Sequence, residues 1–264
     1  MLFLFSLIVF AVSITHTREV FSLDRYQVIF LPEEHTSKED HDFQLSIIKL
    51  LFSRGYKFLI AMEMFQQPFQ QALDEYIACK IDEEEMLKRT QYSKRWSFDP
   101  SFYRDIWMYA KDKGIRLKAI NISSELVHAI RSKGLDRVGD DSLPHPIIPN
   151  SEKEMQELKK TLASHPKVDK RRFFDVQNAW DNGMALAISR LMDKYAGYKV
   201  VVLVGRGHAI DYDMGIPRRL KILKPEVRIK ILKREDFQRD LLFSIDFSND
   251  SSSATSMSEP NCRP

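Results

Sequence analysis

The chain has 264 residues, of which 44% are hydrophobic and 29% are charged, and its formal net charge at pH 7 is +3. A globular chain of this size buries a sizeable core, so it needs neither a disulfide framework nor a structural metal in order to fold. The nearly balanced charge, without a basic stripe interleaved with aromatic residues, argues against nucleic acid as a partner. The two cysteines, Cys79 and Cys262, are too far apart in sequence for a zinc-ribbon motif.

Residues 2–14 form an almost unbroken apolar run. The run is shorter than the about 20 residues that a transmembrane helix needs, and it matches the apolar region of a secretory signal, with Ala11-Val12-Ser13 as an acceptable cleavage site. Only the α-amino group charges the segment before it, so an uncleaved anchor and a misassigned start codon are the alternatives. We expect residues 1–17 to be a signal peptide or N-terminal anchor. The protein would then be secreted across the inner membrane and be periplasmic or membrane-associated.

The rest of the chain alternates strand-like runs with helical patterns. Short apolar runs predict strands at 27–31, 57–62, 115–121, 199–204 and, at an edge, 227–232. Caps and apolar periodicity predict helices that begin near Ser37 or Asp40, near Pro68, after Asp82, at Asp99-Pro100, at Ser123 or Ser124 and after Ser151, with further helices over 171–195 and 217–223. This alternation predicts an α/β fold with a mainly parallel sheet flanked by helices.

Two stretches, 81–99 and 136–175, hold helical patterns without an intervening strand. We expect them to form a helical subdomain or lid over the ends of the strands. Residues 248–264 are polar and rich in serine, which predicts a disordered tail. The α/β domain itself is therefore expected to span 18–247.

Two of the apolar runs end in the same way. Pro32-Glu33-Glu34-His35 follows the first strand, and Gly205-Arg206-Gly207-His208 follows the fourth. Ligands of open α/β sheets bind outside the carboxyl ends of the strands, where these two turns are expected. The pattern predicts that His35 and His208 lie on one rim of the sheet, although most of the chain separates them.

Acidic side chains accompany these histidines. Glu33 precedes His35, and Glu63 follows an apolar strand, where a buried carboxylate needs a partner. Carboxylate and imidazole together act as general base and orienting acid, or hold a divalent metal that activates water. We predict a catalytic or metal-ligating set of Glu33, His35, Glu63 and His208. Each residue alone is more simply a solvated acid or a hydrogen-bonded histidine, but their position on successive strand ends favours a functional cluster.

The residues alone also bear on two other ligands, a dinucleotide and haem. The turn at Gly205 and Gly207 lacks the third glycine of a dinucleotide fingerprint, because Ile210 occupies that position, and this disfavours nucleotide binding. No Cys-x-x-Cys-His motif occurs, which excludes covalent c-type haem. Tyrosine, histidine and methionine side chains nevertheless remain available to ligate haem iron without a covalent link.

Short motifs follow one another in a defined order over about residues 26–225. They are Pro32-Glu33-Glu34-His35 with His41 and Gln44, Ala61-Met62-Glu63-Met64-Phe65, Gln70-Gln71-Ala72-Leu73-Asp74-Glu75-Tyr76, the residues Trp96, Tyr103 and Asn121, Gln177-x-x-x-Asp181-x-x-Met184-Ala185, and Gly205-Arg206-Gly207-His208 with Gly215-Ile216-Pro217. In this order they resemble the ChaN-type haem-binding family of the Tiki superfamily, which includes TraB-like and erythromycin-esterase-like proteins.

The resemblance implies an extracytoplasmic protein that binds haem in bacterial iron acquisition, as a homodimer that encloses haem. We expect the haem ligand among His41, Tyr92, Tyr103 and Tyr212; the three tyrosines lie in or near the helical excursions or the second histidine turn. For the wider superfamily the resemblance implies a Glu/His hydrolase, metal-dependent in the Tiki branch, which is the alternative function. Whether the chain is an enzyme stays open.

Two features depart from the family pattern. Pro32 replaces the first glycine of the family motif, so the turn has a fixed φ and loses one N–H donor. A third hypothesis is therefore an adaptor whose site has decayed. No cysteine follows the apolar N-terminal run, so a lipid anchor is not expected.

Overall fold

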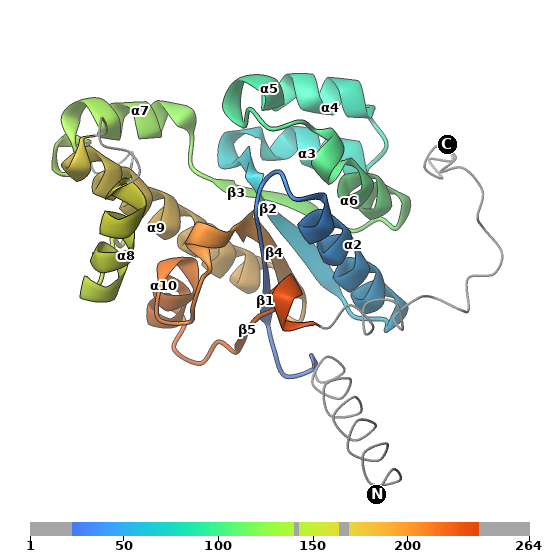
Figure 1. Ribbon diagram of the computed structural model, residues 1–264. Coiled ribbons are helices and arrows are strands. Elements are labelled where there is room, and N and C mark those ends of the chain that lie inside the picture. The colour runs from blue at the N-terminus through green and yellow to red at the C-terminus, as the bar shows by residue number, and fades with distance from the viewer. Residues whose placement is uncertain (1–22, 140–142, 164–168, 238–264) are drawn as a thin grey trace, which may run out of the picture.

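The computed structural model describes residues 23–139, 143–163 and 169–237. Within them lies a five-stranded parallel sheet in the order β3-β2-β4-β1-β5 (Figure 1). The strands are β1 (Val28–Glu33), β2 (Phe58–Gln66), β3 (Leu117–Asn121), β4 (Lys199–Gly205) and β5 (Ile229–Ile231). The α/β class, the five predicted strands and the edge position of the last one are confirmed. The predicted signal segment, residues 1–17, and the predicted tail, residues 248–264, lie outside the described residues.

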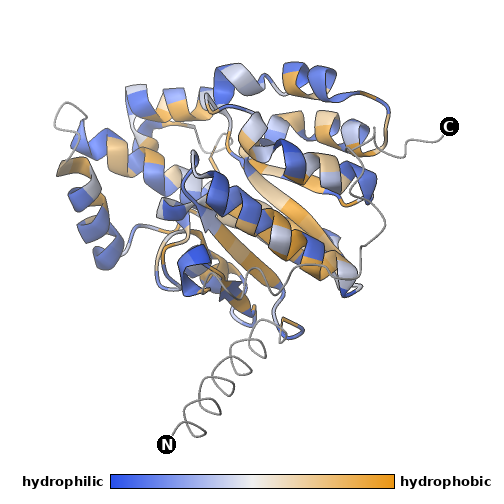
Figure 2. Cartoon of the chain, turned by 45° about the vertical axis from the view of Figure 1, so that its right-hand side comes forward, coloured by the Kyte–Doolittle hydropathy of each residue, from blue (hydrophilic) through white to orange (hydrophobic). Residues whose placement is uncertain are grey.

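Helices cover both faces of the sheet. One face packs against α2 (Lys38–Ser53), α3 (Gln70–Ile77), α4 (Glu83–Arg89), α5 (Tyr92–Arg95) and α6 (Ser101–Asp112), and the other against α9 (Lys170–Lys194) and α10 (Gly215–Leu223). Successive strand residues point to opposite faces, and a sheet covered on both sides needs continuous apolar strands. Figure 2 shows this pattern, with almost uniformly apolar strands between helices of mixed polarity.

A smaller core joins α7 (Ser124–Lys133) to α9 beyond the end of β3. Ile122, Val127 and Ile130 pack there against Val176 and Ala179. Helix α8 (Glu152–Ala163) lies on the same side of the molecule (Figure 1). Short 3₁₀ turns complete the described chain; they are η1 (Gln67–Phe69), η2 (Leu135–Arg137), η4 (Arg206–His208) and η5 (Arg234–Asp236).

The predicted helix caps are present. Ser37 accepts a hydrogen bond from the Asp40 N–H, Asp82 from that of Glu85, and Ser123 from that of Leu126. Such caps satisfy N–H groups that have no partner within the helix. No described helix is long and apolar enough to cross a membrane.

The structure corrects the expected loop at Pro32. Strand β1 continues through Pro32 to Glu33, with Pro32 paired in register to Val204 of β4. The Phe30 carbonyl accepts a hydrogen bond from the Leu232 N–H, so the backbone polar groups of Phe30 face the β5 side of the strand. Pro32 lies two residues later in the same strand, so its backbone nitrogen faces the same side. Strand β5 pairs with β1 only as far as Phe30. The missing N–H of Pro32 therefore costs the sheet no hydrogen bond.

Candidate functional site

Glu33 is the first of two buried carboxylates at the carboxyl ends of the strands. Its Oε1 accepts from the Tyr103 hydroxyl at 2.7 Å and from His35 Nδ1 at 3.0 Å. Its Oε2 accepts from Gln44 Nε2 at 2.8 Å, and His41 Nε2 lies 3.3 Å away at ion-pair distance. Burial by itself raises the pKa of Glu33, but the hydrogen bond from His35 and the close contact with His41 outweigh it and lower the pKa to about 2. Glu33 is therefore a carboxylate at every physiological pH.

Glu63, in β2 just after the last residue paired with β4, forms the second centre. Its Oε2 accepts from the Gly205 N–H at 2.6 Å, and its Oε1 lies 3.4 Å from His208 Nε2. The other ring nitrogen of His208 bonds Asp181 Oδ1 at 2.7 Å. Burial lowers the pKa of His208, but the charges of Glu63 and Asp181 outweigh it and raise the pKa to about 10. His208 is therefore an imidazolium held between two carboxylates.

His35 lies between the two centres. Its Nδ1 bonds Glu33, and its ring rests on Gly205, where a Cβ atom would come within 2.7 Å of the His35 Cε1. Burial lowers the pKa of His35, but the hydrogen bond to Glu33 and the charge of Glu63 outweigh it and raise the pKa. The structure thus brings together the four predicted residues Glu33, His35, Glu63 and His208.

The surroundings of His35 are aromatic. Its ring centroid lies 4.8 Å from that of Trp96 and 4.7 Å from that of Phe98, both in the segment between α5 and α6. The His35 side chain keeps 27% of its surface exposed, whereas the side chains of Glu33 and Glu63 are buried. His35 is thus the most accessible member of the four-residue set, and it borders an apolar wall.

A buried ionic network extends from Asp181 to the second helical excursion. Asp181 Oδ2 lies 3.4 Å from Arg219 Nη1, and the fully buried Arg219 also pairs with Glu154 of α8. Glu154 in turn accepts from the Gly215 N–H at 2.7 Å. The sequence indicated Asp181 only as part of a family motif and did not indicate Arg219. The signal for Asp181 was its place in that motif on the predicted long helix.

The predicted haem ligands are not gathered in one place. Tyr92, Tyr103 and His41 are buried in the core between the sheet and α2–α6, and the Tyr103 hydroxyl donates to Glu33. Tyr212 is 41% exposed, and its hydroxyl accepts from the Ile231 N–H at 3.1 Å. In this arrangement only Tyr212, of the four predicted ligands, has an accessible ring.

The prediction of a divalent metal finds no support. No group of three or more His, Cys, Asp or Glu side chains with a metal-binding arrangement occurs in the described ranges. The oxygens of Glu33 are occupied by Tyr103, Gln44 and His35, and an oxygen of Glu63 is occupied by the Gly205 N–H. These hydrogen bonds occupy most of the lone pairs of Glu33 and one of those of Glu63.

Comparison with known proteins shows the family. A model described as haem-binding uptake, Tiki superfamily, ChaN matches residues 20–220. ChaN of Campylobacter jejuni, solved with cofacial haem, is similar at a TM-score of 0.61 and 18% identity over 82% of this chain and 84% of its own. A mutant of the erythromycin esterase EreC has a TM-score of 0.49 and 16% identity over 80% of this chain and 70% of its own. The comparison with curated proteins gives no match. Because the family model covers most of the sequence, the chain belongs to the haem-binding uptake family ChaN of the Tiki superfamily.

Proposed function

We propose that this protein binds haem and serves in extracytoplasmic haem or iron acquisition. The observation that carries the proposal is the family match over residues 20–220. The similarity to Campylobacter jejuni ChaN, which binds haem cofacially, extends over most of both chains and supports a shared fold. Secretion through residues 1–17, membrane tethering and a homodimer that encloses haem belong to the same proposal.

Two residues of this chain fit haem iron as ligands. His35 has a partly exposed ring whose Nδ1 donates to the buried Glu33, and such a second bond commonly orients a metal-ligating histidine. Trp96 and Phe98 beside it offer aromatic surface to a porphyrin. Tyr212 is the alternative ligand, because it is the exposed member of the predicted set. When bound, haem supplies an iron centre and an extended apolar ring. This chain would supply the side chain that ligates the iron and the aromatic surface of Trp96 and Phe98.

A haemin titration of the full chain, followed by absorbance, tests the proposal. We expect a saturable shift of the Soret band that is lost in either His35→Ala or Tyr212→Phe. Tyr92→Phe is the matched control, because the Tyr92 ring lies in the core. Absence of a saturable shift would exclude haem binding. A band unchanged in both ligand variants would exclude these two residues as ligands.

Two further measurements test the remaining parts of this proposal. Sedimentation of the full chain with and without haemin tests the homodimer, which we expect to form or strengthen with haemin. Amino-terminal sequencing of protein recovered from a bacterial periplasm tests secretion, and we expect a mature chain that begins near Arg18. A monomer at every haemin concentration, or an intact N-terminus in the cytoplasm, would overturn the corresponding part.

A Glu/His hydrolase is the second candidate function, and the geometry around His35 favours it. His35, oriented by Glu33, would take a proton from water, and the hydroxide so formed would attack an ester carbonyl carbon. We expect turnover of a p-nitrophenyl ester that rises with pH as His35 loses its proton and that disappears in His35→Ala. Turnover that survives this substitution would remove the site from consideration.

A further inference from the structure

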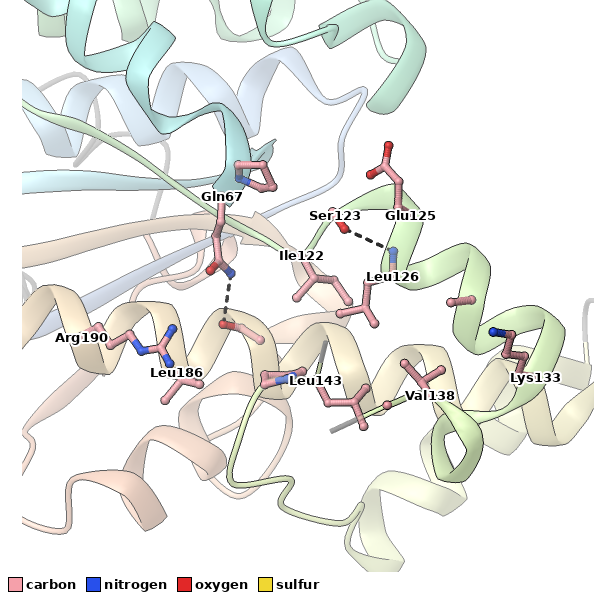
Figure 3. A pocket seen from close by; sticks show the side chains of 15 residues that line it. Gln67, Ile122, Ser123, Glu125, Leu126, Lys133, Val138, Leu143, Leu186 and Arg190 are labelled. Atoms are coloured by element: carbon pink, nitrogen blue, oxygen red, sulfur yellow. Dashed lines mark hydrogen bonds between the residues drawn. The ribbon is translucent and has the colours of Figure 1, made fainter. Parts of the chain in front are cut away.

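A separate cleft lies between α7 and α9 (Figure 3). Its volume is about 650 Å³, within the range of roughly 300–1,000 Å³ typical of small-molecule sites. Figure 3 shows apolar side chains along its length, among them Ile122, Leu126, Leu143 and Leu186. None of the residues of the Glu/His cluster lines it. The cleft is therefore separate from the Glu/His cluster.

The polar side chains on one wall of the cleft are already engaged. Glu125 receives two hydrogen bonds from Arg95, at 2.7 and 3.0 Å. Gln67 donates to the Ile120 carbonyl, and the Ser123 hydroxyl caps α7. These groups therefore have little hydrogen-bonding capacity left for a ligand.

Two cations at the ends of the cleft are different. Figure 3 shows Arg190 of α9 at one end and Lys133 of α7 at the other, with the apolar side chains between them. Both residues are exposed, and neither makes an ion pair within the described part of the chain. A trough of mixed polarity, with apolar side chains along its middle and a cation at each end that has no ion pair within the described residues, complements a molecule with an apolar body and an anionic end.

We propose that this cleft binds a small amphipathic carboxylate of the fatty-acid type. The apolar body would lie along Leu126 and Leu186, and the carboxylate would pair with Arg190 or Lys133. The fifteen lining residues include no His, Tyr, Met or Cys, so the cleft offers no side chain that ligates haem iron. The inference is accordingly independent of the proposed haem binding.

Fluorescence titration of the full chain with cis-parinarate, whose emission rises in apolar surroundings, tests the proposal. We expect saturable binding that weakens about fivefold in the double variant Lys133→Gln/Arg190→Gln, since an exposed charge pair is worth up to about 1 kcal/mol. The methyl ester of the probe should bind both proteins alike. Arg131→Gln is the matched control, because Arg131 is exposed on α7 but does not line the cleft. No saturable binding, or equal affinity of the double variant, would overturn the proposal.

Filling the cleft distinguishes it from the haem site. Ala129 lines the cleft on α7, so Ala129→Phe should abolish parinarate binding and leave the haemin Soret shift unchanged. His128→Phe adds the same ring at an exposed position outside the cleft and should alter neither. Loss of both ligands in Ala129→Phe, with displacement of parinarate by haemin, would show that the cleft holds haem. That outcome would overturn the inference of a second site and leave haem binding intact.

Discussion

Asp181→Asn tests whether His208 is held as a cation. The asparagine oxygen can still accept from His208 Nδ1, which lies 2.7 Å from Asp181 Oδ1, but the negative charge is lost. Charges about 4 Å apart at an effective dielectric constant of about 20 attract by about 4 kcal/mol. Arg219 keeps Glu154 as its partner, so the variant does not leave that guanidinium alone. We expect the free energy of unfolding at pH 6 to fall by about 3 kcal/mol.

The raised pKa of His208 determines how the stability difference between wild type and Asp181→Asn changes with pH. The pKa of His208 is raised from 6.5 to about 10 in the folded protein. Its stabilising contribution is therefore fully present below pH 6.5 and is lost as the pH rises through 10. In Asp181→Asn the pKa of His208 falls towards its ordinary range, so wild type and variant should differ most below pH 6.5 and converge near pH 10.

Urea unfolding from pH 5.5 to 10 measures the stability difference, and the ring resonances of His208 report its protonation. Asp193→Asn is the matched control on the same helix, because Asp193 forms an exposed pair with Lys224 and should cost at most about 1 kcal/mol. A His208 ring that titrates near 6.5 in the wild-type protein would refute the reasoning. An unfolding difference that grows towards pH 10 would refute it as well.

Three further substitutions test other parts of the structure. Gly205→Ala suits the backbone, whose φ is −56°, but its Cβ would lie 2.7 Å from His35 Cε1, so we expect a displaced His35 resonance and a loss of about 1–3 kcal/mol of stability in urea. Lys199→Met leaves the carbonyls of Leu23, Asp24 and Tyr26, the first of them buried, without their ammonium donor and should cost about 2 kcal/mol in the same assay. Glu33, with its pKa lowered from 4.5 to about 2, stabilises the fold above pH 4.5 and loses this effect as the pH falls through 2, so the deficit of Glu33→Gln should shrink between pH 4.5 and 2. A deficit that is constant over this range would contradict the assignment.

Element type was predictable because it depends on local patterns. Apolar runs located the five strands of the described residues, and Ser37, Asp82 and Ser123 were recognisable as caps. Strand order was not predictable, since the strands present similar apolar runs and hydropathy does not distinguish their neighbours. The extension of β1 through Pro32 was missed because proline normally disrupts a ladder, and only the early end of β5 makes it harmless here.

The candidate site was predictable in its members and not in its connections. Glu63 and His208 could be assigned to one rim from strand ends alone, but the Gly205 N–H that binds Glu63 lies 142 residues away in sequence. Tyr103 was expected near haem, yet it is fully buried on α6 and bonds Glu33. Its spacing of three and seven residues from the buried Ile106 and Ala110 was the available signal. Arg219 had no such signal, because an arginine on a basic helix is usually exposed.

Stability alone does not account for the Glu/His cluster. Replacing a buried ion pair by well-packed apolar residues is often neutral or stabilising, because desolvation offsets the attraction between the charges. This chain nevertheless keeps Glu33, Glu63 and Asp181 buried together with His208 and Arg219, close to the carboxyl ends of β1 and β4 and the last part of β2. Leucine and valine could fill these positions, as apolar residues fill most of the other strand positions. His35 is the partly exposed histidine of this arrangement, and its ring packs against Trp96 and Phe98. The Glu33 carboxylate holds its Nδ1, so Nε2 is the nitrogen left for a ligand or a proton. A network that fixes one accessible imidazole is what ligand binding or proton transfer requires, and packing of the core does not require it.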